Sequence, residues 1–278
     1  MAAGFPFLRE CLAQLPALDV IDGVFVQRGL ARDPFEQRYL EVRRKEGRLY
    51  TDAQVRRLPH PGGSLGASLE WRVRALSSAM LVQHLRARGG EGAILELGCG
   101  NGWLSQLLAQ SLQRDVCGID VNRTELTQAA RVFGHEQRLS FVAADIQTLV
   151  LPRAVFDVVV LPACIQYFAD PAALVARLLA QLRDGGELHI IDSPLYADRQ
   201  RAEASAARSL RYFTDLGVPD LAGQYHQHTY AMFERFAVRW LFDPRRPGAR
   251  LRRLFKLRQP HFPWLCIRKQ DNLQVIAR

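Results

Sequence analysis

The stretch ILELGCGNGWLSQLLA, residues 94–109, decides the fold. Apolar residues lead into Gly98, Gly100 and Gly102, and a leucine-rich amphipathic run follows at once. Glycine at alternate positions is typical of backbone that bends sharply or approaches another group closely. A strand that ends in such a turn and opens a helix points backbone N–H groups at a ligand. The stretch therefore predicts a binding loop between a strand and a helix.

Strand-like and helix-like segments alternate along residues 93–192. The strand-like runs are AILEL, VCGID, LSFVAAD, FDVVVL and ELHIID, and the helix-like runs are WLSQLLAQSLQ, RTELTQAARVFG and DPAALVARLLAQLRDGG. Continuous apolar strands separated by helices of roughly 10–15 residues indicate βαβ units. Asp170 and Pro171 predict the start of the last helix, and Gly185 and Gly186 predict its end. We expect an α/β fold with a mostly parallel sheet and helices on both faces.

The flanking regions predict an extension and an insertion. Residues 1–67 carry mixed helical signals broken by LPHPGGSLG, and we interpret them as a helical and irregular N-terminal extension. Apolar residues at helical spacing predict a helix over 68–88, which two glycines end. The main domain would span 68–278, with an irregular substrate-binding insertion at 193–260. The runs FPWLCIRK and LQVIAR predict a hairpin that closes the sheet.

The spacing of the loop disfavours two common nucleotide-binding motifs. A dinucleotide-binding fingerprint has the pattern G-x-G-x-x-G, but the sixth position here is Trp103, whose bulk would obstruct close packing of helix on strand. A phosphate-binding P-loop needs a lysine directly after its last glycine, and none follows Gly102. The remaining pattern is E-x-G-x-G-x-G, which begins at Glu96.

This pattern resembles motif I of the class I S-adenosylmethionine-dependent methyltransferases, and the resemblance covers about residues 90–192. VCGID ends in Asp120, where the family's acidic residue accepts hydrogen bonds from the ribose hydroxyls. FVAAD ends in Asp145, where the family's aspartate meets the adenine amino group, with Ile146 against the ring. The runs FDVVVLPACIQYFADP and GGELHIID resemble the fourth and fifth strands. The similarity is closest to the small-molecule enzymes that include the ubiquinone-biosynthesis methyltransferases.

The resemblance implies a Rossmann-like sheet of seven strands and S-adenosylmethionine as the cofactor. It implies the following cofactor-binding residues: Glu96, Gly98, Cys99, Gly100, Asn101, Asp120, Val121, Asp145, Ile146 and Leu161. Acidic residues at the ends of successive parallel strands meet at one edge of the sheet, where open α/β sheets bind ligands. S-adenosylmethionine carries a sulfonium cation and no phosphate, so the carboxylate of Glu96 is compatible with this site.

The methyl acceptor is less determined. The loop LPACIQYF lacks the [DN]-P-P-[FYW] run of enzymes that methylate amino groups of bases or glutamine, and it lacks the Pro-Cys pair of RNA cytosine enzymes. We therefore expect a small-molecule oxygen, nitrogen or carbon as the acceptor. No aspartate and asparagine set resembles that of the magnesium-dependent catechol enzymes, and we expect no metal.

The candidate catalytic residues are His226, His228 and Tyr167. The two histidines in GQYHQHTYAMF would share one face of a strand, and histidine titrates near neutral pH, which suits removal of a proton from a hydroxyl acceptor. Tyr167 in the IQYF loop is a candidate contact for the methionine moiety or the acceptor. The alternative is that these side chains pack in the interior or lie on the surface. A general base is not required, because positioning alone lowers such barriers by about 7–11 kcal/mol.

The helix over 68–88 offers a lid, with Trp71, Arg72 or Arg74 covering the cofactor; the alternative is a helix that only packs on the sheet. We interpret YLEVRRKEGRLY as a solvated helix. Trp103 is expected to pack the first helix of the domain, and His189 is expected in the interior.

The formal charge of +9 is concentrated at the C-terminal end. Residues 239–278 contain 11 Lys and Arg and 2 acidic residues, whereas the rest of the chain is balanced. The patch is either a solvated basic face or a surface for an anionic partner. Leucines 251, 254 and 257 at helical spacing favour weak association with a membrane surface. A nucleic-acid-directed methyltransferase or binding module is the alternative function, because basic residues contact phosphates.

Five scattered cysteines, without Cys-x-x-Cys spacing, argue against a zinc site and a disulfide framework. No run of about 18 apolar residues predicts a membrane-spanning helix. We expect a cytoplasmic protein, and the oligomeric state is left open.

Overall fold

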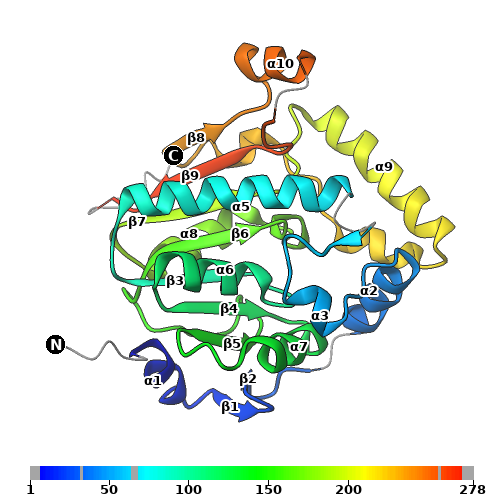
Figure 1. Cartoon of the computed structure of the whole chain (residues 1–278). Helices are drawn as coiled ribbons and strands as arrows, with labels where there is room; N and C mark the ends of the chain where they lie inside the picture. Colours follow the sequence, from blue (N-terminus) through cyan, green and yellow to red (C-terminus); the bar gives the residue numbers. More distant parts are fainter. Residues whose placement is uncertain (1–6, 32–33, 64–67, 256–257, 271–278) are drawn as a thin grey trace.

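A nine-stranded sheet forms the centre of the computed structural model, which describes residues 7–31, 34–63, 68–255 and 258–270 (Figure 1). The strands are β1 (Leu18–Ile21), β2 (Val24–Gln27), β3 (Ala93–Leu97), β4 (Val116–Asp120), β5 (Leu139–Ala143), β6 (Phe156–Pro162), β7 (Leu182–Ile191), β8 (Val238–Phe242) and β9 (Trp264–Arg268). Their order across the sheet is β1-β2-β5-β4-β3-β6-β7-β9-β8.

Parallel pairing runs through the six strands from β2 to β7, whereas β1, β8 and β9 pair antiparallel with their neighbours. Every residue of β3, β5 and β6 is buried. Strands covered on both faces read as continuous apolar runs, which is why the sequence pattern identified them. The predicted α/β class and mostly parallel sheet are confirmed.

Helices cover both faces of the sheet, as predicted. The helices are α1 (Phe7–Ala13), α2 (Pro34–Lys45), α3 (Asp52–Val55), α5 (Leu69–Arg88), α6 (Trp103–Leu112), α7 (Arg123–Phe133), α8 (Pro171–Gln181), α9 (Arg199–Asp215) and α10 (Pro247–Leu254), with short 3₁₀ turns η1 (Ile165–Tyr167), η2 (Pro219–Gln224) and η3 (Tyr230–Phe233). Buried side chains of α5, α6 and α7 join one apolar cluster with the sheet, and those of α1 and α8 join the other. The sheet is thus the middle layer of three.

The strand number and the N-terminal extension differ from expectation. The seven strands that the resemblance implies are present in the order β5-β4-β3-β6-β7-β9-β8. The extension, expected to be helical and irregular, also forms the hairpin of β1 and β2, and β2 pairs parallel with β5. The sheet is wider because the short apolar run VFVQ satisfies the open edge of β5.

The C-terminal strands also pair differently. FPWLCIRK forms β9, but its antiparallel partners are β7 and β8 (Val238–Phe242), a strand that the sequence analysis did not identify. The run LQVIAR, residues 273–278, lies outside the described residues. The predicted hairpin between these two runs is therefore replaced, in the described part of the chain, by β8–β9.

The ends of two predicted helices show where local signals hold. Gly89 ends α5 as expected, and Asp170 Oδ1 accepts a hydrogen bond of 2.9 Å from Ala173 N at the expected start of α8. The start of α5 is capped by Ser68, whose side chain accepts a hydrogen bond from Trp71 N. However, α8 ends at Gln181, and the predicted stop at Gly185 and Gly186 lies inside β7. Gly185, with φ 72°, sits where the register between β6 and β7 shifts, so its conformational freedom serves a strand irregularity.

A small separate cluster joins the N-terminal extension to the insertion. Val42 of α2 packs with Phe213 of α9 and with Val218 and Leu221 around η2. Figure 1 shows α2 and α9 on the same side of the sheet, at the right of the view. These elements from opposite ends of the sequence therefore form one wall beside the carboxyl ends of the central strands.

Candidate active site

The glycine turn after β3 is held open by close approaches within the protein. Gly98, Gly100 and Gly102 have φ values of 75°, 50° and 74°, a region that side-chain-bearing residues rarely adopt. A Cβ on Gly98 would lie 2.6 Å from Cys164 Cβ, and one on Gly102 would lie 2.6 Å from the ring of Phe141. Two of the three glycines thus allow the turn to pack on neighbouring strand ends, and Gly100 faces the cavity described below.

Two carboxylates follow the turn at the ends of the next two strands. Asp120 at the end of β4 accepts hydrogen bonds from Gly100 N (2.8 Å) and Asn122 N (2.9 Å). Burial raises the pKa of Asp120, and these backbone donors oppose the rise. Asp145, just after β5, accepts a hydrogen bond of 2.8 Å from Gln147 N. Each carboxylate is oriented by backbone groups and retains acceptor capacity, because an ionised carboxylate offers about four lone-pair sites.

Glu96 lies beneath the turn rather than at its surface. Its side chain is 1% exposed, and Ser105 Oγ of α6 donates a hydrogen bond of 2.5 Å to Glu96 Oε2. Burial raises the pKa of Glu96 to about 8, although the hydrogen bond from Ser105 and the charge of Arg74 act to lower it, so the group is largely protonated at neutral pH. A positively charged ligand in the cavity would favour its ionised form.

Two further polar side chains beside the turn, those of Asn101 and Glu125, have too few polar partners to offset the cost of burial. The buried Oδ1 atom of Asn101 has no hydrogen-bond partner among the described residues. Glu125, in the first turn of α7, lines the same cavity, and burial together with Asp120 raises its pKa to about 7. The sequence analysis missed Glu125; its only signal was its place three residues after Asn122, which caps α7 through Oδ1.

One large cavity collects these groups. From the strand ends it is lined by Glu96, Leu97, Gly98, Cys99, Gly100, Asn101, Trp103, Leu104, Asp120, Val121, Asn122, Glu125, Ala144, Asp145, Ile146, Pro162, Ala163, Cys164, Tyr167 and Phe168. From the N-terminal region it is lined by Glu36, Tyr39, Arg43, Arg48, Tyr50, Glu70, Trp71 and Arg74. Nine of the ten predicted cofactor residues are therefore brought together at one edge of the sheet. Leu161 is the exception: it is fully buried in β6 and belongs to the core.

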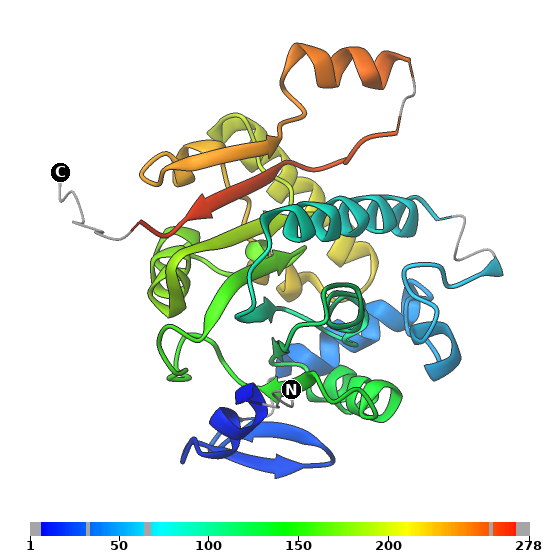
Figure 2. The ribbon, with the colours of Figure 1, turned by 60° about the vertical axis from the view of Figure 1, so that its left-hand side comes forward.

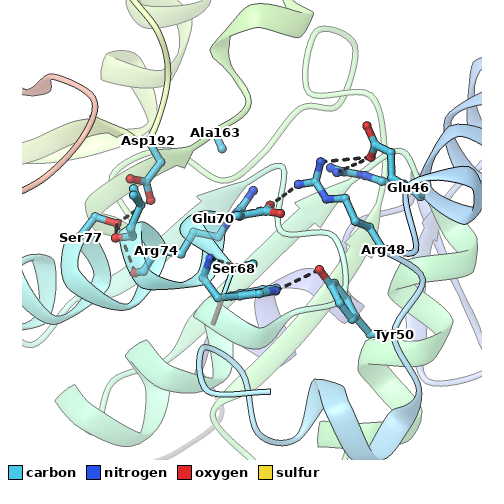
Figure 3. Close-up of polar contacts among 12 residues, drawn as sticks. Glu46, Arg48, Tyr50, Ser68, Glu70, Arg74, Ser77, Ala163 and Asp192 are labelled. Carbon is cyan, nitrogen blue, oxygen red and sulfur yellow. Dashed lines mark hydrogen bonds and ion pairs between the residues drawn. The ribbon is translucent and has the colours of Figure 1, made fainter. Parts of the chain in front are cut away.

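The N-terminal region closes the cavity with an aromatic wall. Trp71 of α5 packs edge-on against Trp103 at 5.5 Å. Tyr50 Oη accepts a hydrogen bond of 3.0 Å from Trp71 Nε1, drawn as the dashed line to Tyr50 in Figure 3. Of the three side chains considered for a lid, Trp71 and Arg74 line the cavity, whereas Arg72 is exposed and does not line it.

A chain of alternating charges runs along this wall. Arg48 pairs with Glu46 and with Glu70, and Glu70 Oε1 accepts a hydrogen bond of 3.1 Å from Arg74 Nε (Figure 3). Arg43 extends it, with Nη1 3.6 Å from Glu46 Oε2. The interpretation of YLEVRRKEGRLY as a solvated helix is therefore wrong, because this segment supplies four of the cavity residues given above.

Tyrosine side chains from three segments meet at the other side of the cavity. The hydroxyl groups of Tyr167 (η1) and Tyr225 are 2.9 Å apart, and Tyr39 (α2) contacts Tyr167 edge-on at 6.5 Å. Arg43 Nη2 donates a hydrogen bond of 2.6 Å to Tyr39 Oη. Burial raises the pKa of Tyr167 well above its ordinary value, so its hydroxyl stays protonated.

The structure does not bring the predicted histidines into the cavity. His228 is 2% exposed, and its Nε2 atom lies 3.1 Å from Ile165 O. His226 N donates to Gln166 O at 2.7 Å, and its ring stacks on that of His228. Neither ring lines the cavity, because the segment around them is a loop pinned to η1 rather than a strand facing the site. Of the three candidate catalytic residues, only Tyr167 reaches the cavity.

A second polar cluster lies away from the cavity, between α5 and β7. His84, Glu187 and His189 place ligand-type atoms within 4.8 Å of one another. Trp264 Nε1 donates to His189 Nδ1 at 3.2 Å, so the neutral His189 ring carries its proton on Nε2, the atom that faces Glu187. Arg88 and Arg239 also approach Glu187. This arrangement fits an ion-pair network that ties α5 to the sheet, and it agrees with the interior position expected for His189.

Comparison with known proteins identifies the part of the chain that holds the turn. Residues 94–186, about a third of the chain, match a family described as a methyltransferase domain. The malonyl-[acyl-carrier protein] O-methyltransferase of Paenibacillus sp. is 28% identical over 118 residues, which cover 41% of this chain and 43% of that protein. The 2-methyl-6-phytyl-1,4-hydroquinone methyltransferase of Synechocystis sp. is 26% identical over 144 residues, covering 52% and 43%. The chain thus spans less than half the length of these curated relatives.

Solved structures agree on the fold. A plantazolicin methyltransferase in complex with a desmethylplantazolicin analogue and SAH has a TM-score of 0.53 at 17% identity, with 87% of this chain and 96% of that chain covered. The phosphoethanolamine N-methyltransferase 2 of Haemonchus contortus, in complex with S-adenosyl-L-methionine, has a TM-score of 0.51 at 15% identity, covering 80% and 61%. At these identities the likeness supports the Rossmann-like fold alone.

Proposed function

We propose that this chain, whose residues 94–186 form a class I methyltransferase domain, binds S-adenosylmethionine in the cavity and transfers its methyl group to a small molecule. The observation that carries the proposal is the convergence of the glycine turn, Asp120 and Asp145 on one enclosed space at the carboxyl edge of the sheet. This is the edge at which open α/β sheets bind ligands. The methyltransferases similar to this chain act on small molecules and on a carrier-bound malonyl group, by their names.

The residues present fit the cofactor. The turn is kept free of side chains by glycines whose φ values are positive, and the unpartnered Oδ1 atom of Asn101 lies in the cavity wall. Asp120 would accept hydrogen bonds from the ribose hydroxyls, and Asp145 would accept one from the adenine amino group. Ile146 would pack against the adenine ring. A dinucleotide or a nucleoside phosphate fits less well, because acidic side chains outnumber the arginines in the lining, with Glu36, Glu70, Glu96, Asp120, Glu125 and Asp145 against Arg43, Arg48 and Arg74.

The wall of aromatic and charged residues supplies what methyl transfer requires of a protein. When bound, the cofactor would supply an electrophilic methyl group on its sulfonium. Trp71 and Trp103 exclude water from this space. Tyr39 and Tyr167 offer hydroxyl groups to hold the acceptor opposite the cofactor. Such positioning accounts for about 7–11 kcal/mol of barrier lowering in favourable cases.

The acceptor atom is an oxygen, nitrogen or carbon that needs no histidine base. Among the described residues that line the cavity there is no histidine, and the phenol of Tyr167 is held protonated. A proton leaving the acceptor would pass to water or to Glu125, whose pKa of about 7 matches such a role. We do not retain the nucleic-acid alternative, because none of the exposed arginines around α10 lines the cavity.

We also propose that the protein acts in the cytoplasm. All five cysteines are unpaired, and four of them are buried, which suits a reducing compartment. Within the described residues, no helix is long and apolar enough to span a membrane.

Turnover with methyl-labelled S-adenosylmethionine tests the proposed function. The chain is incubated with the labelled cofactor and with panels of small carboxylic acids, phenols, quinols and amines, and S-adenosylhomocysteine and labelled product are measured. We expect formation of S-adenosylhomocysteine that depends on one acceptor class and is lost in Asp120→Ala. An absence of S-adenosylmethionine binding would contradict the proposal.

A further inference from the structure

Helix α10 carries its apolar side chains on the outside of the molecule. Leu251, Leu254 and Phe255 are 56%, 75% and 66% exposed, whereas Ala249 is the buried residue of the helix. Successive helical residues are separated by about 100°, so Leu251, Leu254 and Phe255 share one face and Ala249 lies opposite to it. The helix therefore contacts the rest of the domain through Ala249, and its large apolar side chains point toward solvent.

Arginines flank this face. Arg250 and Arg252 lie about 100° to either side of Leu251 on the helix, and both are exposed. Arg246, Arg253 and Arg258 are exposed as well, and the sequence contains no acidic residue from 244 to 270. Arg245 is different, because it pairs with Asp243 and stacks over Tyr230.

The helix is also accessible. In both views α10 projects beyond the edge strand β8, away from the helices that cover the sheet (Figures 1 and 2). Two hydrogen bonds fix it to the segment that follows: Gln259 Nε2 donates to Ala249 O at 3.0 Å, and Arg252 Nη2 donates to Arg258 O at 3.1 Å. Among the described residues, none stands in front of the outer face of α10 in these views, so a broad surface can approach it.

We propose that the outer face of α10, defined by Leu251, Leu254 and Phe255 and rimmed by Arg250 and Arg252, docks on the surface of an anionic lipid bilayer. A helix with leucine and phenylalanine on one face and arginine beside them lies in the interface, with its apolar side chains below the headgroups and its cations among them. The positive charge complements anionic headgroups. Nucleic acid is disfavoured as the occupant because two of the three residues that define the face are leucines, which neither pair with phosphates nor stack on bases, and Phe255 is its only aromatic residue.

The contact is weak and reversible, because only three large apolar side chains enter the bilayer. Docking through α10 leaves the cavity free, since no residue of this helix lines it. This inference does not depend on methyl transfer, and its failure would leave the cofactor proposal unchanged.

Co-sedimentation of the full chain with vesicles tests the proposal. Vesicles of phosphatidylglycerol and phosphatidylcholine in equal parts are compared with vesicles of phosphatidylcholine alone. We expect binding to the anionic vesicles that weakens as the ionic strength rises toward about 0.15 M. The double substitution Arg250→Gln and Arg252→Gln is expected to weaken it by roughly fivefold for each arginine. Leu251→Ser with Leu254→Ser is expected to weaken it by about tenfold or more.

The matched control is Leu210→Ser on α9, where a leucine of similar exposure (50%) lies outside the proposed face. It should bind vesicles as the wild type does. All substituted side chains are exposed, and within the described part of the chain only Arg252 gives up a hydrogen bond, the exposed one to Arg258 O, so the melting temperature should change by no more than a few degrees. Equal binding by the leucine double variant and the wild type would overturn the proposal, as would binding of single-stranded RNA by the wild type with no binding to either kind of vesicle.

Discussion

Replacing Asp120 by alanine removes the acceptor at the end of β4. In the wild type the two carboxylate oxygens are oriented by Gly100 N at 2.8 Å and Asn122 N at 2.9 Å. The proposed site adds ribose hydroxyl donors to the same carboxylate. A hydrogen bond to a charged group contributes about 1.5–3 kcal/mol.

We expect Asp120→Ala to weaken cofactor binding by about 2–4 kcal/mol, because part of the loss is recovered when water reaches the freed N–H groups. At about 1.4 kcal/mol per factor of ten, this is a loss of roughly 30-fold to 1,000-fold. Titration calorimetry with S-adenosylhomocysteine measures it without turnover. The buried end of the turn also loses a partner for Gly100 N, so urea unfolding should be recorded for the same variant.

Asp198→Ala is the matched control. Asp198 caps α9 by accepting a hydrogen bond of 2.8 Å from Arg201 N, and it does not line the cavity. Its loss should lower the free energy of unfolding by about 1 kcal/mol and leave affinity unchanged. If Asp120→Ala binds within about threefold of the wild type, Asp120 is not part of the cofactor site and the reasoning fails.

Three further predictions concern protons and packing. Binding of S-adenosylmethionine near pH 7.5 should release protons. Burial raises the pKa of Glu96 to about 8 and that of Glu125 to about 7, and the bound sulfonium cation would lower both. Calorimetry in buffers of different ionisation enthalpy measures the proton release, and a binding enthalpy that does not depend on the buffer would refute it. Glu187→Gln should lower the free energy of unfolding at pH 7 by roughly 1–3 kcal/mol. Burial acts to raise the pKa of Glu187, but hydrogen bonds from His189 and His84 lower it to about 2. The stability that this carboxylate contributes is therefore present above pH 4.5 and is lost as the pH falls toward 2. Identical pH profiles of stability for the variant and the wild type would contradict this. Trp71→Ala should lower the free energy of unfolding by about 3–5 kcal/mol in urea titrations, because a buried ring is lost from the wall, and a cost below about 1 kcal/mol would show that the wall does not pack as described.

The central part of the fold was predictable because its signals are local. The glycine turn, the buried apolar strands, the cap at Asp170 and the end of α5 at Gly89 are each fixed by residues near in sequence, and all of them are confirmed. The strand β8 was missed because it is a short edge strand in which no residue is fully buried. The two glycines after α8 were misread, since a glycine that relieves a strand irregularity has the same local signature as a helix stop.

The wall of the site was not predictable, since it depends on contacts between distant segments. Tyr39 and Arg43 lie on a helix whose sequence is charged throughout, and only the packing of α2 against α9 turns these side chains toward the cavity. The same limit applies to His226 and His228. Their spacing suggested a strand facing the site, whereas hydrogen bonds to η1 hold the segment as a loop behind it.

The most direct test of the account is a crystal structure of the chain with S-adenosylhomocysteine. The account predicts the ligand in the cavity at the carboxyl edge of the sheet, with its ribose at Asp120, its adenine at Asp145 and its amino-acid end beside Gly98 and Gly100. A ligand bound elsewhere, or a cavity that stays closed by Trp71 and Trp103 at saturating ligand, would contradict it.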